Sequence, residues 1–338
     1  MKVDATLGHE IMTTKEQAAR LEAAGYDGLS NGETSHDPFL QLLQAADVTE
    51  RVTLTTSIAI AFARTPMTLA NIGFDLNLYS KGRFVLGLGS QVKPHIERRF
   101  SMPWSHPAPR MREMVMAIRA IWDCWQNGTK LDFRGDFYTH TLMTPFFSPD
   151  PSPYGLPPIM LAGVGEMMTE VAGEVCDGFF IHAFSTEKYL REHTLPALAR
   201  GRAKAGKTLD DFVVAGPCFI TTGRTEEEMA VAVAGTKDQI AFYASTPAYR
   251  AVLDAHGWGD LQSELTIMTK EGRWSEIGSR ITDEMLHAFS VVGTPEEVGK
   301  GMVRRFGGVA QRTSLYTTYK ADPSLQTEVL HSLRAALG

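Results

Sequence analysis

The sequence contains little cysteine and no long apolar run. Its 338 residues include three cysteines, Cys124, Cys176 and Cys218, which are far apart and odd in number. This usage excludes a disulfide framework and is typical of a reducing compartment. No apolar run approaches the roughly 18 residues that a membrane span needs, and the first residues lack the apolar core of a signal peptide. We therefore expect a cytoplasmic protein.

An excess of positive charge is also missing. The chain has 33 Lys and Arg residues against 39 Asp and Glu residues, a net charge of −6, and no basic stripe. Nucleic acids and anionic membranes are therefore not the expected partners. The balance of hydrophobic and charged residues, 43% and 21%, is ordinary for a globular protein. We expect a small-molecule substrate and a homodimer.

Several well-known catalytic motifs are absent. No GxGxxG follows the first predicted strand, which weakens a dinucleotide-binding doubly wound sheet as the fold. The chain has no HExxH, CxxC or GxSxG, so a zinc site and an α/β-hydrolase have little support. Residues 201–208 match the P-loop pattern, but they end a predicted helix instead of following a strand. Gly206 is accordingly predicted to be a helix C-cap.

Short apolar segments alternate with helical segments along the whole chain. The predicted strands are residues 3–7, 26–31, 52–60, 83–89, 159–161, 178–182, 212–221 and 313–319. Eight such strands, each followed by a helix, predict an α/β fold, the TIM (β/α)8 barrel, as a single domain over residues 1–338. Insertions at roughly 91–109, 130–158 and 244–290 are expected at its carboxyl-terminal face, the second including a hairpin.

The carboxyl ends of the predicted strands carry the candidate functional residues, because active sites of TIM barrels lie there. Glu33 and His36 follow the second strand and form an ionisable pair suited to proton transfer. Asp37, just before Pro38, is predicted to cap the next helix. His182 ends the sixth strand and is either a further catalytic candidate or a hydrogen-bonded histidine of the barrel rim.

A glycine-rich turn follows the fifth strand. Gly163, Val164 and Gly165 lead directly into a predicted helix that begins at Glu166. Free N–H groups and a positive dipole at a helix N-terminus favour anions. We therefore predict a phosphate-binding turn at residues 163–166.

Several stretches together resemble a known family, the bacterial luciferase-like flavin and deazaflavin oxidoreductases, and most closely its coenzyme F420-dependent branch. The stretches that carry the resemblance are residues 25–28, 51–66, 82–90 (GRFVLGLGS), 110–113, 121–122, 133–138 (FRGDFY), 172–178 and 293–298. The similarity covers nearly the whole chain, and these stretches are specific in this order.

The resemblance implies a TIM barrel that holds a tricyclic ring at the carboxyl ends of its strands. It implies a bulge with a cis peptide at Ser57-Ile58, next to Ala59, against the ring. The phosphate site falls on residues 163–165, and Glu33 matches an acidic residue near the ring. Gln91 stands where some relatives carry a glutamate, so their catalytic acid is missing, and Gln91 is expected among the cofactor-binding residues. Thr34 replaces a histidine after the acid.

The function that follows is hydride transfer between C5 of coenzyme F420 and an unidentified organic substrate. Phe62, Trp104 and Phe184 are expected to shape an apolar substrate pocket. The alternatives are an FMN-dependent luciferase-like monooxygenase and, from another class, a catalytically silent barrel that binds a ligand.

Overall fold

Parallel strands alternate with helices along the chain, as the sequence predicts. The computed structural model describes residues 1–338 and has the closed eight-stranded parallel barrel of the TIM fold, surrounded by helices. The predicted fold class is therefore confirmed. No helix combines the length and the apolar character needed to cross a membrane. All three cysteines are free thiols.

Two compact units divide the chain. The N-terminal unit consists of Asp4–Phe180 and Ala197–Val213, and the C-terminal unit of Met1–Val3, Ile181–Pro196 and Val214–Gly338. The expectation of a single domain stays a prediction.

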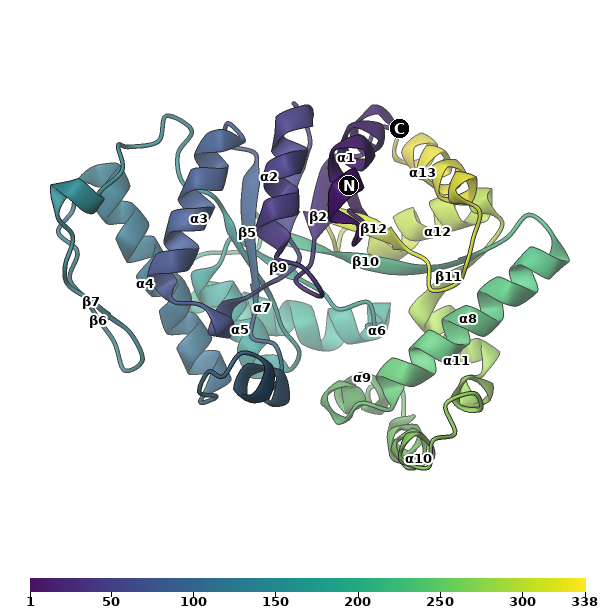
Figure 1. Cartoon of the computed structure of the whole chain (residues 1–338). Coiled ribbons are helices and arrows are strands. Elements are labelled where there is room, and N and C mark those ends of the chain that lie inside the picture. The colour runs from purple at the N-terminus through teal and green to yellow at the C-terminus, as the bar shows by residue number, and fades with distance from the viewer. The chain divides into compact units, whose positions relative to one another are not determined.

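The barrel strands of the N-terminal unit are parallel neighbours in chain order, and helices lie beside them (Figure 1). They are β1 (Lys2–Thr6), β2 (Gly28–Asn31), β3 (Thr53–Thr56), β5 (Phe84–Gly89), β8 (Ile159–Ala162) and β9 (Gly178–Phe180), with β4 (Ala59–Ile60) pairing with β5. The helices are α1 (Thr14–Ala23), α2 (Pro38–Val48), α3 (Pro66–Tyr79), α4 (Pro107–Asn127), α5 (Glu166–Val175) and α7 (Leu195–Lys204). Each predicted strand here is present within a few residues of its expected bounds.

Local sequence signals set the ends of these elements. Asp37 caps α2 by accepting a hydrogen bond from the Phe39 N–H at 2.9 Å, as predicted. Gly206 lies just beyond α7 with φ of 68°, so the P-loop-like segment is a helix end, as predicted. The predicted hairpin is β6 (Phe133–Arg134) with β7 (Thr139–His140). Its turn is held by Glu113 of α4, whose carboxylate accepts from backbone N–H groups of residues 136–138.

The C-terminal unit contains the remaining strands. The long strand β10 (Val213–Thr222) lies between β11 (Ser290–Gly293) and β12 (Arg312–Tyr316), and all three are parallel. The sequence missed β11, because four residues directly after a helix leave no room for a strand pattern. The helices are α6 (Glu187–Tyr189), α8 (Glu226–Ala244), α9 (Arg250–Asp254), α10 (Gly259–Lys270), α11 (Asp283–Phe289), α12 (Pro295–Phe306) and α13 (Pro323–Leu337).

The insertion after α8 builds a hydrophobic core of its own within the C-terminal unit. Side chains of α8 to α11 pack there against Phe184 and Phe219. Aromatic residues, among them Tyr243, Tyr249 and Tyr316, lie at its edge and are partly buried. The predicted insertion at 244–290 is therefore largely helical, and it contributes Tyr249 to this edge.

Candidate active site

The third barrel strand contains a bulge, and its Ser57-Ile58 peptide is cis. Thr55 of β3 pairs with Val85 of β5, and Ala59 of β4 pairs with Leu88. Three residues therefore lie between the two paired positions on one strand and two on the other, which is one extra residue. The cis peptide and the bulge are both confirmed. Ser57 is exposed, so this backbone face is open to a ligand.

A threonine side chain replaces the hydrogen bonds that the bulge removes. Thr56 Oγ1 accepts from the Gly87 N–H and donates to the Gly87 carbonyl, both at 2.8 Å. A Cβ atom at Gly87 would lie 1.7 Å from the Thr56 carbonyl oxygen. Only glycine therefore allows these strands to approach so closely, which explains one glycine of the sequence FVLGLG.

Glu33 fixes the bulge from the neighbouring strand end. Its N–H donates to the Ile58 carbonyl at 3.0 Å, and its carboxylate accepts from the Ile60 N–H at 2.7 Å. The same carboxylate forms an ion pair with Arg64 at 2.6 Å, and its side chain is only 7% exposed. The geometry gives Glu33 a role in holding the backbone. Its predicted part in proton transfer stays a prediction.

Arg64 is the residue of this site that sequence reasoning missed. Its guanidinium bridges Glu33 and Asp37, at 2.6 and 2.7 Å, and lies over the Phe39 ring. Although burial lowers it, hydrogen bonds to Glu33 and Asp37 leave the pKa of Arg64 raised. The acids lie 31 and 27 residues before the arginine. Arg64 is a basic residue that follows the third predicted strand, as Glu33 and Asp37 follow the second. This shared position at strand ends could have suggested the ion pairs.

The structure does not bring His36 to Glu33. Thr34, Ser35 and His36 are exposed, whereas the Glu33 side chain is turned toward the bulge. No hydrogen bond joins the two residues. Proton transfer by His36 stays a prediction, and it requires an exposed imidazole that acts without Glu33.

The glycine turn before α5 is uncovered. Gly165 is the N-cap, with φ of 82°, and no side chain caps the helix. Residues 164–167 are exposed. A Cβ atom at Gly163 would lie 2.5 Å from Met168 Cγ, so the tight turn requires glycine there. The N–H groups of residues 163–166 are thus available to an anion, and their binding of phosphate stays a prediction.

Charge at this turn is balanced by α7. Glu166 forms an ion pair with Arg200, which also contacts Glu170 at 3.3 Å. The acidic side chain at the start of α5 is therefore partly neutralised, which reduces its repulsion of an incoming anion.

Gln91 follows β5 with a left-handed backbone, φ of 59°. Its Oε1 accepts from the Val92 N–H at 3.0 Å, and its predicted contact with a cofactor stays a prediction. Phe62 and Trp104 meet edge to face, with ring centroids 5.7 Å apart. Two of the three aromatic residues expected to shape a pocket are thus in contact.

His182 belongs to a group of aromatic residues in the C-terminal unit. We define the aromatic cluster as His182, Tyr243, Tyr249 and Tyr316. The His182 ring stacks on Tyr249 at 4.6 Å and meets the edge of Tyr243 at 4.8 Å. Its Nδ1 accepts from the Phe184 N–H at 3.0 Å. In a neutral ring the proton is then on Nε2, which donates to Tyr249 Oη at 3.2 Å.

Burial keeps His182, Tyr243 and Tyr249 uncharged at neutral pH. It lowers the pKa of His182 to about 4 and raises the pKa of Tyr249. Burial is also the main cause that raises the pKa of Tyr243, whose hydroxyl lies 3.3 Å from that of Tyr316. His182 is therefore a neutral hydrogen-bond donor near pH 7. This supports the interpretation as a hydrogen-bonded histidine of the barrel rim, and its catalytic role stays a prediction.

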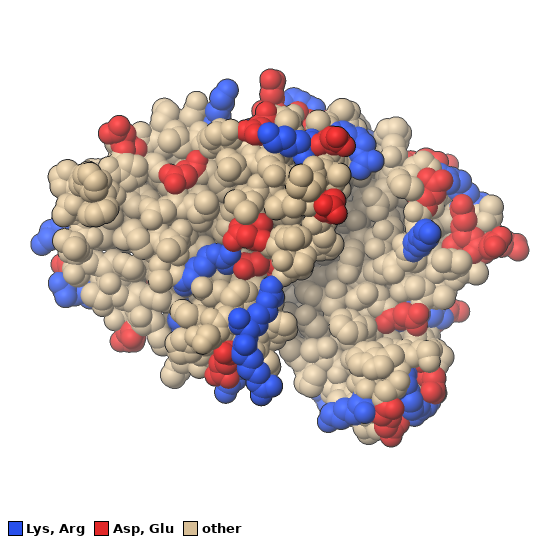
Figure 2. Space-filling view, viewed as in Figure 1, with Lys and Arg blue, Asp and Glu red and all other residues tan.

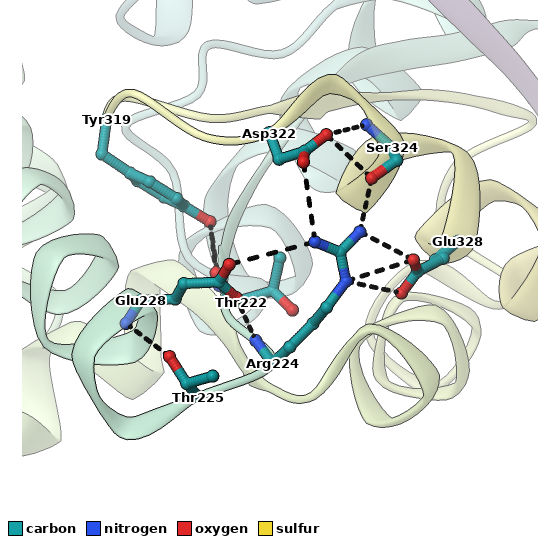
Figure 3. Close-up of polar contacts among 8 residues, drawn as sticks. All are labelled: Thr222, Arg224, Thr225, Glu228, Tyr319, Asp322, Ser324 and Glu328. Atoms are coloured by element: carbon teal, nitrogen blue, oxygen red, sulfur yellow. Dashed lines mark hydrogen bonds and ion pairs between the residues drawn. The ribbon is translucent and has the colours of Figure 1, made fainter.

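Arg224 follows β10 and is surrounded by acidic residues (Figure 3). It pairs with Glu328 at 2.7 Å and with Glu228 and Asp322 at 3.9 Å. Tyr319 Oη accepts from the Thr222 N–H and donates to the Thr222 carbonyl. In many TIM barrels the loops after the last two strands bind phosphate. Here the arginine of these loops already has three carboxylate partners.

Charges of both signs are interspersed on the face shown in Figure 2, with uncharged areas between them. No group of three or more His, Cys, Asp or Glu side chains is placed to hold a metal ion. The candidate binding features are therefore the bulge and the glycine turn in the N-terminal unit and the aromatic cluster in the C-terminal unit.

Comparisons with known proteins identify the family and agree with the fold. An uncharacterized protein of Mycobacterium tuberculosis is 51% identical over 312 residues, 92% of each chain. The 5,10-methylenetetrahydromethanopterin reductase of Archaeoglobus fulgidus is 26% identical over 82% of this chain and 81% of its own. The solved coenzyme F420-dependent tetrahydromethanopterin reductase of Methanopyrus kandleri superposes with a TM-score of 0.78 at 18% identity, covering 97% of this chain and 96% of its own. The family model described as luciferase-like monooxygenase matches residues 3–312, so the chain belongs to the luciferase-like family and is an oxidoreductase.

Proposed function

We propose that this oxidoreductase uses coenzyme F420 and transfers a hydride between the deazaflavin and an organic substrate. The observation that carries the proposal is the open bulge at Ser57, Ile58 and Ala59, which Glu33 holds through main-chain and side-chain hydrogen bonds. Similarity to a reductase named as coenzyme F420-dependent supports this cofactor. The Archaeoglobus fulgidus relative, 26% identical, is likewise named as a reductase of a tetrahydromethanopterin compound.

The residues present fit such a cofactor. A flat ring needs a face without bulky side chains, and the small, exposed Ser57 contributes to one. A phosphate needs uncovered N–H donors, which residues 163–166 supply at a helix N-terminus. When bound, the deazaflavin would provide the hydride chemistry, and the protein provides position and electrostatics.

The charged residues of the site act on the backbone. Arg64 compensates the buried carboxylate of Glu33, and Glu33 in turn orients the Ile58 carbonyl and the Ile60 N–H. We propose Glu33 as a positioning residue. The exposed His36 is the remaining candidate for proton exchange with solvent at this end of the barrel.

An FMN-dependent monooxygenase is the second candidate, because the matching family model is described as luciferase-like monooxygenase. Both cofactors carry a tricyclic ring and a phosphate, and the bulge and the turn suit either. The two differ in their reaction with oxygen, which FMN undergoes readily and a 5-deazaflavin hardly at all.

Titration of the cofactor-free protein with coenzyme F420 and with FMN tests the proposal. We expect a saturable change of ring fluorescence with F420 at lower concentration than with FMN. Saturation by FMN alone would identify the monooxygenase instead. Failure of both cofactors to bind would contradict both functions and favour a catalytically silent barrel.

A further inference from the structure

Two residues of the aromatic cluster lie at or just after the carboxyl ends of barrel strands. Tyr316 is the last residue of β12, and His182 follows β9 by two residues. The carboxyl ends of barrel strands are where TIM-barrel enzymes bind their substrates. Tyr249 comes from the insertion after α8 and stacks on His182. The insertion thus delivers a tyrosine hydroxyl to a strand-end histidine.

The aromatic cluster has an apolar frame. Phe184 lies 5.7 Å from Tyr249, and Phe219 stacks on Tyr316 at 5.1 Å. Burial is the one cause that shifts the pKa of His182 and of Tyr249, and no Asp, Glu, Lys or Arg contributes. A charged ligand would therefore have no countercharge in the aromatic cluster.

The Tyr249 hydroxyl of the aromatic cluster has a hydrogen-bond donor left over. Phe184 N–H donates to His182 Nδ1, and His182 Nε2 donates to Tyr249 Oη. Tyr249 accepts in this pair, so its own O–H hydrogen is directed elsewhere, and no protein atom accepts it. Donation from the imidazole strengthens that hydroxyl as a donor.

Arg224, which follows β10, does not supply a free positive charge for an anionic ligand. Arg224 has its guanidinium divided among Glu228, Asp322 and Glu328 (Figure 3). A phosphate approaching it would meet three carboxylates. The corner of the barrel that often binds phosphate therefore repels it here.

We propose that the aromatic cluster binds an uncharged, largely apolar substrate through a carbonyl or hydroxyl oxygen that accepts the hydrogen bond of Tyr249. His182 is the positioning residue that orients this donor. The inference rests on the proposed function, because it names the substrate class of that oxidoreductase. It excludes phosphate esters such as sugar phosphates.

Ligand-observed saturation-transfer NMR tests the proposal with cyclohexanone and cyclohexyl phosphate as matched probes. We expect saturation of cyclohexanone by the wild-type protein and none of cyclohexyl phosphate. Tyr249→Phe removes one hydroxyl and should weaken cyclohexanone binding about tenfold. Tyr154→Phe, at a half-exposed tyrosine of the N-terminal unit, is the control and should change nothing.

The role of His182 has its own readout. His182→Gln retains an N–H donor and should keep part of the affinity, whereas His182→Phe should lose as much as Tyr249→Phe. The ¹⁵N spectrum of the histidine should show the Nε2–H tautomer, without titration between pH 5.5 and 8. A charged imidazole in this range would contradict the argument.

The outcomes separate this inference from the proposed function. Equal binding of both probes, binding of neither, or an unchanged affinity in Tyr249→Phe would overturn the inference, even if the protein binds coenzyme F420. Selective binding of cyclohexanone without any binding of F420 would leave the substrate class standing and overturn the cofactor.

Discussion

The two units place opposite kinds of chemistry at their strand ends. In the N-terminal unit, Glu33, Arg64 and Asp37 form a chain of ion pairs that holds a bulged strand. In the C-terminal unit, His182 and Tyr249 form a neutral pair within an aromatic layer. Charged side chains here hold the backbone, whereas the hydrogen-bond donor left for a ligand is uncharged. Breaking each region should therefore have different consequences.

Removing the cation of the N-terminal unit should have the largest effect. Arg64→Met leaves the Glu33 carboxylate buried without its ion-pair partner, so we expect a loss of about 3 kcal/mol of unfolding free energy. Urea unfolding measures it. Lys15→Met removes the exposed ion pair with Asp47 and is the matched control. Equal losses in the two variants would show that the buried pair does not hold this unit.

A double variant sharpens that result. Glu33→Met with Arg64→Met replaces the buried ion pair with apolar side chains and should recover part of the stability lost in Arg64→Met, because no buried charge is left unpaired and the Asp37 side chain is 41% exposed. Cofactor affinity should not recover, since the bulge loses its carboxylate contact with the Ile60 N–H. Recovery of both properties would assign Glu33 no positioning role.

In the C-terminal unit, the contribution of His182 to the free energy of unfolding should depend on pH. The folded-state pKa of His182 is lowered to about 4, so the unfolded chain takes up the proton first as the pH falls below about 6.5. Stability is therefore retained at pH 7 and lost toward pH 4. The titratable groups that face His182, Tyr243 and Tyr249, have raised pKa values and do not titrate in this range.

The loss attributable to His182 between pH 7 and pH 5 should be about 2 kcal/mol. It is the difference between the stability profiles of the wild-type protein and His182→Gln, each measured by urea unfolding. Subtracting the profiles removes the other histidines from the comparison. Parallel profiles would mean that His182 keeps an ordinary pKa.

An anion site made of backbone N–H groups should respond to added charge. Gly165→Asp introduces a carboxylate at the N-terminus of α5 and should weaken binding of the cofactor about tenfold. Gly206→Asp is the control, because Gly206 also has a positive φ and open space around it. The same control tests the P-loop-like segment. Weakening by Gly206→Asp alone would move the anion site to that segment.

The sequence predicted those features that depend on short stretches of chain. Most strands, the Asp37 cap and the turn at residues 163–166 are each determined by a few neighbouring residues. The bulge was predicted from the resemblance to a known family. Arg64 was missed because its partners are distant in sequence and join it only when β2 and β3 pair. Tyr249 was missed because it lies in an irregular insertion, where neither helical nor strand periodicity marks it.

The smallest effect is expected at Arg224, where charges are paired but remain in solvent. Arg224→Met breaks the contacts with Glu228, Asp322 and Glu328, yet these side chains are 39%, 57% and 47% exposed and stay hydrated. Water and salt screen such pairs, so the urea midpoint should fall far less than in Arg64→Met, and the difference should vanish in 1 M salt. Because the three carboxylates remain, cyclohexyl phosphate should still not bind. A loss comparable to that of Arg64→Met would show that paired charge stabilises both units alike, and the contrast between them would then lie in the aromatic cluster alone.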